Sequence, residues 1–399
     1  MTSEVLVMTP SAVAMAADSV VTINGNKTYE GVNKLFMLSK NPPMGIMIYN
    51  NANFISIPFE TLIKDFRKQM INENLNTVDE FRDKFKDYLE NEPQKNTMIS
   101  MSLQDKIKLF LNHMSNEINS LDENTIDEWL INKSAIDIFD KYKDVIFNDD
   151  SLIKFNGCLN SIVPEFLDSD KKEVFLEILR NIFVQIMVLE NFTGVAIVGF
   201  EKDKLFPSCT LFKIRYLFDD KFIFDDIEND GVGQKVVIFA PLAQTDVIES
   251  FFTSIDIATE NHLKMFFASI IEGYNHNLKQ LIQSEVDFSP KDANMMIDIL
   301  YKAQNKHPNL NIAFDRFIGD IKRNNRTPIL TSLQFLPKDE LSNFAESLIN
   351  LTSLKRKVQD GLETVGGDVD VAIITKGEGF IWTKRKHYFN AELNHHYFE

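Results

Sequence analysis

The first fifty residues carry the pattern that most restricts what this chain can fold into. Short apolar segments follow one another there, with turns between them, at residues 4–8, 12–17, 20–23 and 44–49. The sequence Asn24-Gly25-Asn26 follows the third segment. Short apolar runs bounded by Gly, Pro and Asn are typical of buried β-strands. The sequence therefore predicts that residues 4–50 form strands of a sheet.

Three polar residues stand at defined places in this strand region. Thr2 follows Met1, Asp18 ends the segment Ala16-Ala17-Asp18-Ser19, and Lys34 precedes a further apolar segment. In residue type and in spacing, this opening resembles the start of proteasome β-type subunits, which are N-terminal-nucleophile hydrolases. Taken singly, each residue also has an ordinary explanation as a turn carboxylate, a solvated lysine or a chain terminus.

The resemblance implies that Thr2, Asp18 and Lys34 are catalytic. Removal of Met1, which a small following residue favours, would leave Thr2 with a free α-amino group. A threonine hydroxyl is a weak nucleophile that needs a base, and an α-amino group with an ordinary pKa of about 8 can be that base. A protonated Lys34 beside Asp18 favours the neutral amine and the developing alkoxide. The implied function is that of a threonine peptidase.

Further site residues follow from the same resemblance, and here the sequence departs from the family. The family strand that corresponds to residues 44–49 ends in a glycine whose N–H holds the oxyanion, whereas this chain has Asn50. A backbone N–H remains at any residue except proline, so Asn50 is the predicted oxyanion residue. Thr245 or Gln244 replaces a supporting serine, although a helix N-cap role explains either residue as well. Gly366 belongs to a Gly-Gly turn like the one before the last strands of the family.

The hydrophobic period changes from strands to helices after residue 58, and it changes back later in the chain. The predicted fold class is α+β, an αββα four-layer N-terminal-nucleophile sandwich of two antiparallel sheets between helices, with helical insertions. We expect core strands at 193–200, 209–218, 221–224, 235–239, 369–375 and 380–383, and separate helices that begin after Pro337 and at residue 354. The predicted division of the chain is core 2–74, helical insertion 75–190, core strands 191–245, helical expansion 246–350, and a core end 351–399 with the last helix, the Gly-Gly turn, the final strands and a tail.

Composition narrows the function classes. The chain has 399 residues, 44% of them hydrophobic and 25% charged, and a formal net charge of −16. Such a negative charge argues against nucleic-acid and anionic-membrane partners. Cys158 and Cys209 are the two cysteines, and we interpret them as buried thiols of a cytoplasmic protein. No metal-ligand spacing or cofactor motif is present, so we expect neither a metal nor a cofactor.

Two alternatives to a peptidase remain open from the sequence. The chain is either a catalytically silent structural or regulatory relative that keeps the fold, or an amidase for small molecules. The resemblance also implies a homo-oligomer that hides its threonine. Because the chain has no ATP-binding motif, any unfoldase that supplies protein substrates would be a separate protein.

Overall fold

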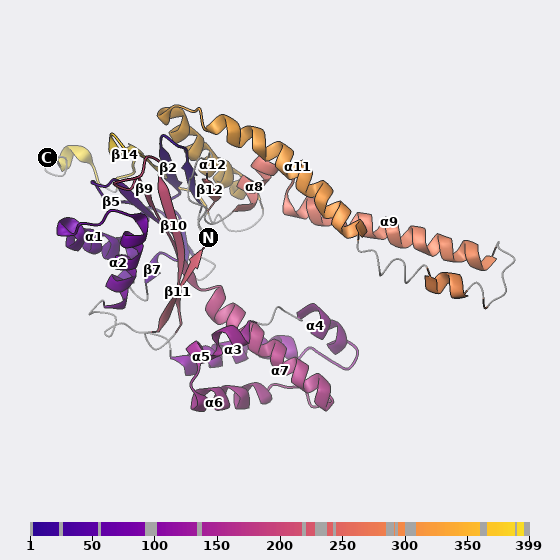
Figure 1. The fold of residues 1–399 in the computed structure, drawn as a ribbon. Helices are drawn as coiled ribbons and strands as arrows, with labels where there is room; N and C mark the ends of the chain where they lie inside the picture. The colour runs from indigo at the N-terminus through magenta and orange to yellow at the C-terminus, as the bar shows by residue number, and fades with distance from the viewer. Residues whose placement is uncertain are drawn as a thin grey trace.

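The computed structural model shows a mixed α+β protein with two antiparallel sheets and many helices (Figure 1). The structure describes residues 3–23, 27–54, 57–91, 102–133, 138–217, 221–227, 238–241, 245–284, 291, 294–299, 309–359, 365–387 and 389–394. The α+β class predicted from the alternation of strand and helix periods is confirmed.

The first sheet has the strand order β12-β1-β2-β13-β14, with every neighbouring pair antiparallel. Its strands are β1 (Glu4–Met8), β2 (Val13–Ala17), β12 (Ile238–Pro241), β13 (Asp370–Thr375) and β14 (Gly379–Lys384). Every residue of β1, β2 and β13 is buried, because other elements cover both faces of this sheet. Ala17 pairs with both Glu4 and Asp370. This register brings the starts of β1 and β13 to the end of β2.

The second sheet has the order β11-β10-β9-β6-β5 and is also antiparallel throughout. Its strands are β5 (Leu35–Ser39), β6 (Met44–Asn50), β9 (Phe192–Gly199), β10 (Ser208–Tyr216) and β11 (Phe222–Ile227). Two short ribbons, β3 (Val21–Ile23) with β4 (Lys27–Tyr29) and β7 (Asn53–Phe54) with β8 (Ile57–Pro58), accompany the sheets. The strands predicted from residue 193 onward are thus confirmed; of the one expected at 235–239, the first three residues lie outside the described part.

The two sheets share one hydrophobic cluster. Its members from the first sheet include Leu6, Met15 and Ile374, and those from the second include Met47 and Val198. Gly45 on β6 shows how closely the sheets approach. A Cβ at residue 45 would lie 2.8 Å from the sulfur of Met15 and 3.0 Å from Cδ1 of Ile374. A larger residue there would push the sheets apart.

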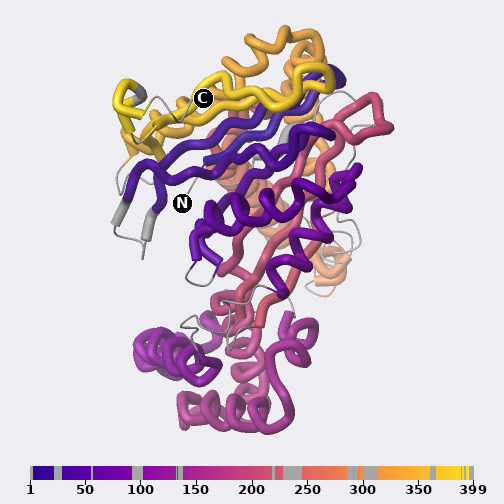
Figure 2. Tube along the Cα trace, turned by 90° about the vertical axis from the view of Figure 1, so that its left-hand side faces the viewer, coloured from indigo at the N-terminus to yellow at the C-terminus, as the bar shows by residue number. Residues whose placement is uncertain are grey.

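Helices cover the other face of each sheet, as the two views show (Figures 1 and 2). On the first sheet, α8 (Thr245–Thr253) and α12 (Lys338–Val358) bury apolar side chains against β1, β2 and β13. On the second, α1 (Phe59–Gln69) and α2 (Val78–Glu90) do the same. Each helix presents apolar residues at three- and four-residue spacing, so one stripe faces the sheet.

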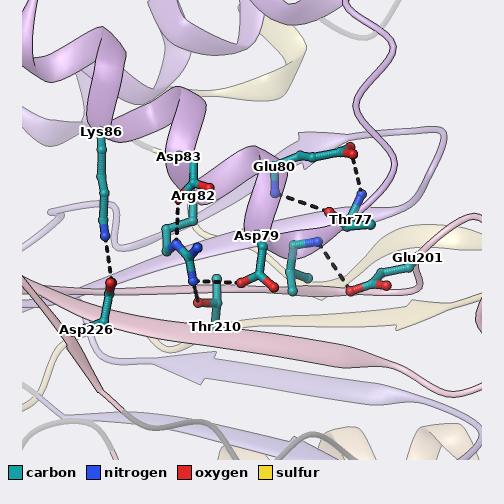
Figure 3. Close-up of polar contacts among 10 residues, drawn as sticks. Thr77, Asp79, Glu80, Arg82, Asp83, Lys86, Glu201, Thr210 and Asp226 are labelled. Carbon is teal, nitrogen blue, oxygen red and sulfur yellow. Dashed lines mark hydrogen bonds and ion pairs between the residues drawn. The ribbon is translucent and has the colours of Figure 1, made fainter.

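Polar contacts fix α2 at its N-terminus and along its sheet-facing side (Figure 3). Thr77 caps the helix through a capping box with Glu80. The Glu201 carboxylate, which follows β9, accepts from the backbone N–H of Val78 at 3.4 Å. Further along, Lys86 pairs with Asp226 of β11 at 2.6 Å. Although the predicted insertion begins at residue 75, α2 therefore packs with the second sheet.

A separate helical unit follows α2. It contains α3 (Leu103–Ile118), α4 (Ile126–Lys133), α5 (Phe139–Ile146), α6 (Asp149–Asn160) and α7 (Ser169–Val184), and it ends in a π-helical turn at Gln185–Leu189. These helices bury a cluster of their own, rich in phenylalanine. Cys158 lies at the edge of this cluster and is only half-buried, whereas Cys209 on β10 is buried. Both thiols are free, and the prediction of burial was wrong for Cys158.

The second helical expansion projects away from the sheets (Figure 1). It contains α9 (Ile257–Ser284), which has no buried side chain, and α11 (Asn309–Leu333). The helix predicted at 354–362 is confirmed as far as Val358, but it is the C-terminal end of α12 and not a separate helix; residues 360–362 lie outside the described part. Within the described residues, no helix is both long enough and apolar enough to cross a membrane.

Candidate active site

Asp18 and Lys34 meet between the two sheets. Asp18 directly follows β2, and Lys34 directly precedes β5. The Nζ atom of Lys34 lies 2.5 Å from Oδ1 of Asp18. Only 1% of Asp18 and 2% of Lys34 is exposed to solvent. Because the pair is buried, water does not screen the attraction between its charges. The positions of the two residues are set by the strands next to them, β2 and β5.

The Asp18 carboxylate also binds two backbone N–H groups. Oδ1 accepts from the amide of Ser3 at 3.0 Å, and Oδ2 accepts from the amide of Gly366 at 3.2 Å. The backbones agree with these contacts, since the amide of Asp18 donates to the carbonyl of Ser3 and that of Ser19 donates to the carbonyl of Gly366. One carboxylate therefore joins the beginning of the chain, the end of β2 and the turn before β13.

Glu4 is a site residue that the sequence reasoning missed. Its Oε1 lies 3.3 Å from Nζ of Lys34, and its side chain is fully buried. The charge of Glu4 also affects Tyr49 on β6. Burial is the main cause that raises the pKa of Tyr49 to about 12, and the charge of Glu4 is the second. The sequence did contain one signal for this role, because Glu4 begins a strand that is otherwise apolar. A glutamate that is buried with such a strand usually has a charged partner.

The predicted residues are only partly brought together. Thr2 and Gln244 lie outside the described residues. Asp18, Lys34 and Gly366 form one hydrogen-bonded group. Thr245 is the first residue of α8, and within the described part of the chain no hydrogen bond or ion pair connects it to Asp18 or Lys34.

Asn50 takes an unusual backbone conformation at the end of β6. Its φ of 70° lies in the left-handed region that glycine favours and that asparagine tolerates best among the other residues. Its side-chain amide donates to the carbonyl of Phe192 at 2.8 Å. The backbone at this position therefore has a conformation that a glycine would take, although the residue is an asparagine.

A cavity of about 780 Å³ lies at the end of β6, where Asn50 lines it; Asp18, Lys34 and Gly366 are not among its lining residues. Asn33, the neighbour of Lys34, lines it together with Asn50, Asn51 and Glu60. Burial acts to raise the pKa of the Glu60 carboxyl, but hydrogen bonds from Lys64 and Asn33 hold that pKa below its ordinary value. Apolar residues such as Val21 and Pro58 share the lining with these polar side chains, so the cavity suits a ligand with both amide and apolar groups.

No family model and no curated protein matches this sequence. Among solved structures, the chain is similar to "Anbu (ancestral beta-subunit)" from Yersinia bercovieri, with 9% identity and a TM-score of 0.30 over 99% of this chain and 92% of that chain. Two structures of Anbu from Hyphomicrobium sp. strain MC1 give 9% and 7% identity, each with a TM-score of 0.32 over 99% of this chain, covering 91% and 93% of the respective Anbu chain. Likeness at these TM-scores supports no conclusion about this chain, whose chemistry must be argued from its own residues.

Proposed function

We propose that this protein is a proteasome-like threonine peptidase, an amide hydrolase whose nucleophile is Thr2 after removal of Met1. One observation carries the proposal. Oδ1 of Asp18 accepts from the amide nitrogen of Ser3 at 3.0 Å and from Nζ of Lys34 at 2.5 Å. The Ser3 nitrogen is covalently bonded to the carbonyl carbon of Thr2, so the shared oxygen links the beginning of the chain to a buried ammonium.

The proposed reaction uses this ammonium without changing its charge. The α-amine of Thr2 takes the proton of its own hydroxyl, and the oxygen attacks the substrate carbonyl. Lys34 stabilises the developing alkoxide and disfavours a second positive charge on the amine. Asp18 holds Lys34 in place, and its two backbone contacts fix the position of the carboxylate. The amine then protonates the leaving group, and water hydrolyses the acyl-enzyme.

The end of β6 suits the oxyanion in this proposal. Asn50 has the left-handed backbone expected of a glycine, so its N–H is our candidate donor to the oxyanion. The adjoining cavity, which Asn50 and Asn33 line, is the proposed substrate cleft. We assign no role in the reaction to Thr245, because no hydrogen bond or ion pair among the described residues connects it to Asp18 or Lys34.

The layer arrangement supports the proposed family at the level of the fold. Helices pack on one face of each sheet, and a shared apolar cluster joins the opposite faces. We infer from these contacts a four-layer αββα sandwich into which two helical units are inserted. We also propose that the chain forms a homo-oligomer in the cytoplasm and receives protein substrates from a separate unfoldase.

A small-molecule amidase is the second candidate. The observation that favours it is the volume of the cavity, about 780 Å³, which lies within the range of small-molecule sites. A catalytically silent relative is the outcome if neither peptides nor small amides react.

Turnover of a panel of peptide amides and small amides tests the proposal. We expect wild-type protein to hydrolyse at least one substrate class, Thr2→Ala to be inactive, and Thr2→Ser to retain activity because it keeps both the hydroxyl and the α-amine. Equal rates for wild type and Thr2→Ala would overturn the assignment of the nucleophile.

A further inference from the structure

We propose that Glu4 is a positioning residue of this site, a second counter-ion that holds the Lys34 ammonium from the β1 side. Its catalytic consequences rest on the proposed function, whereas the pairing itself rests on the geometry of three side chains. The ammonium lies 2.5 Å from Oδ1 of Asp18 and 3.3 Å from Oε1 of Glu4. Two carboxylates, one at the start of β1 and one directly after β2, therefore lie within ion-pairing distance of one cation, which donates a hydrogen bond to Asp18.

Burial makes this arrangement consequential. At most 2% of each of the three side chains is exposed, so solvent does little to stabilise their charges. Residues 5–8 of the same strand are apolar and fully buried. A buried glutamate at the start of such a strand is costly unless a cation compensates its charge. Lys34 lies within ion-pairing distance of Glu4.

The carboxylates of Asp18 and Glu4 have different contacts. Asp18 binds the backbone amides of Ser3 and Gly366 as well as Lys34, so it organises the chain around the site. Glu4 contributes charge beside the ammonium from another direction. When Asp18 is replaced by a neutral residue, Glu4 still lies within ion-pairing distance of Lys34.

Other charged groups near the site have partners of their own. From β10, Arg215 donates to the carboxylate of Asp225. On β13, Asp370 is ion-paired with Lys386.

Tyr49 of β6 is another titratable group affected by Glu4: burial raises the pKa of Tyr49, and the charge of Glu4 raises it further. Its pKa of about 12 keeps it neutral in the working range.

The pairing is tested on the full chain by urea unfolding of Glu4→Gln in two backgrounds. We expect Glu4→Gln to lower the unfolding midpoint of the wild type, and to raise it in Lys34→Met, where the carboxylate has lost its ammonium. Glu201→Gln is the matched control, because Glu201 is buried and pairs with Lys204 at 2.9 Å elsewhere. Its shift should be the same in both backgrounds. An equal shift for Glu4→Gln in both would overturn the pairing.

The positioning role is tested by the rate at which a β-lactone acylates Thr2, measured against pH. We expect Glu4→Gln to lower the maximal rate about tenfold, leave the half-saturating concentration unchanged and move the alkaline limb to lower pH. Glu4→Asp should recover part of the rate, and Glu4→Gln should cost more in the Asp18→Asn background. An unchanged pH profile and equal losses in both backgrounds would overturn the role. If Thr2 reacts in no variant, the proposed function fails, while the unfolding experiment still decides the pairing.

Discussion

Lys34 and Lys106 are both buried, one between the sheets and the other in the inserted helical unit. Their exposed fractions are 2% and 5%. Lys34 contacts the carboxylates of Asp18 and Glu4. Lys106 donates to the backbone carbonyl of Met187 at 3.0 Å, and among the described residues no carboxylate lies within ion-pairing distance of it. Burial accordingly lowers the pKa of Lys106 to about 8.

The two lysines differ in whether carboxylates compensate the buried charge: Lys34 has two such partners, and Lys106 has a backbone carbonyl. In the sheet region, carboxylates on two strands compensate the buried ammonium, so a fixed positive charge is available for chemistry. In the helical unit, the lysine binds a carbonyl of the π-helical turn at Gln185–Leu189, and its charge is a cost. Burial alone therefore does not mark a lysine as functional, whereas its charged partners do.

The largest expected effect is that of Lys34→Met. This change leaves Asp18 and Glu4 buried without their cation, so we expect a loss of roughly 3–5 kcal/mol in the free energy of unfolding. We also expect no reaction of Thr2 with electrophiles. Urea unfolding and lactone labelling measure the two effects. If Lys34→Met were as stable and as reactive as wild type, Lys34 would not compensate the charges of Asp18 and Glu4, and its contrast with Lys106 would fail.

Lys106→Met tests the other lysine through the pH dependence of stability. Between about pH 8 and 10.5 the unfolded chain holds a proton on Lys106 that the folded chain lacks, so wild-type stability should rise with pH across this window. Relative to the variant, the rise should be at most roughly 3 kcal/mol. Unfolding of both proteins at a series of pH values gives the difference. If the stabilities of wild type and variant changed with pH in the same way, burial would not lower the pKa of Lys106.

Asp18→Asn removes the negative charge but leaves Glu4 beside Lys34. We therefore expect an intermediate loss of labelling rate, roughly 10- to 100-fold, from the weakened hydrogen bonds to Lys34 and to the amides of Ser3 and Gly366. Complete loss, equal to that of Lys34→Met, would mean that Glu4 contributes nothing.

Lys64→Met gives the smallest effect and serves as the reference for an exposed lysine. Lys64 pairs with Glu60 at 2.5 Å, but half of its side chain is exposed. Surface pairs contribute about 0.2–1 kcal/mol, so the free energy of unfolding should fall by less than about 1 kcal/mol. A loss comparable to that of Lys34→Met would show that buried partners are not what distinguishes Lys34.

The strands could be predicted from local patterns, whereas the pairing of Asp18 with Lys34 was implied only by the family resemblance. Asp18 directly follows one apolar strand, and Lys34 directly precedes another. Gly366 was predicted as a supporting residue only through the resemblance of its turn, and its contact with Asp18, 348 residues away in the chain, was not predicted. Glu4 was missed because its burial depends on the register between β1 and β2, which no local pattern records.

The helical units were harder to divide from the sequence. The amphipathic stripe of α2 is the same whether it faces a sheet or other helices, and the structure places it on the second sheet. The break expected near residue 350 was wrong because α12 contains neither glycine nor proline and keeps one buried stripe across it. Thr245 shows the same limit, since it begins α8 and, in the part of the chain that the structure describes, makes no hydrogen bond or ion pair with Asp18 or Lys34.

Mass spectrometry of the N-terminal peptide after reaction with a β-lactone tests the central claim most directly. We predict a peptide that begins at Thr2, with Met1 removed and the lactone attached to the Thr2 hydroxyl. We also predict that the adduct is absent in Lys34→Met and unaffected in Lys64→Met. A protein that retains Met1, or an adduct on another residue such as Cys158, would contradict the claim.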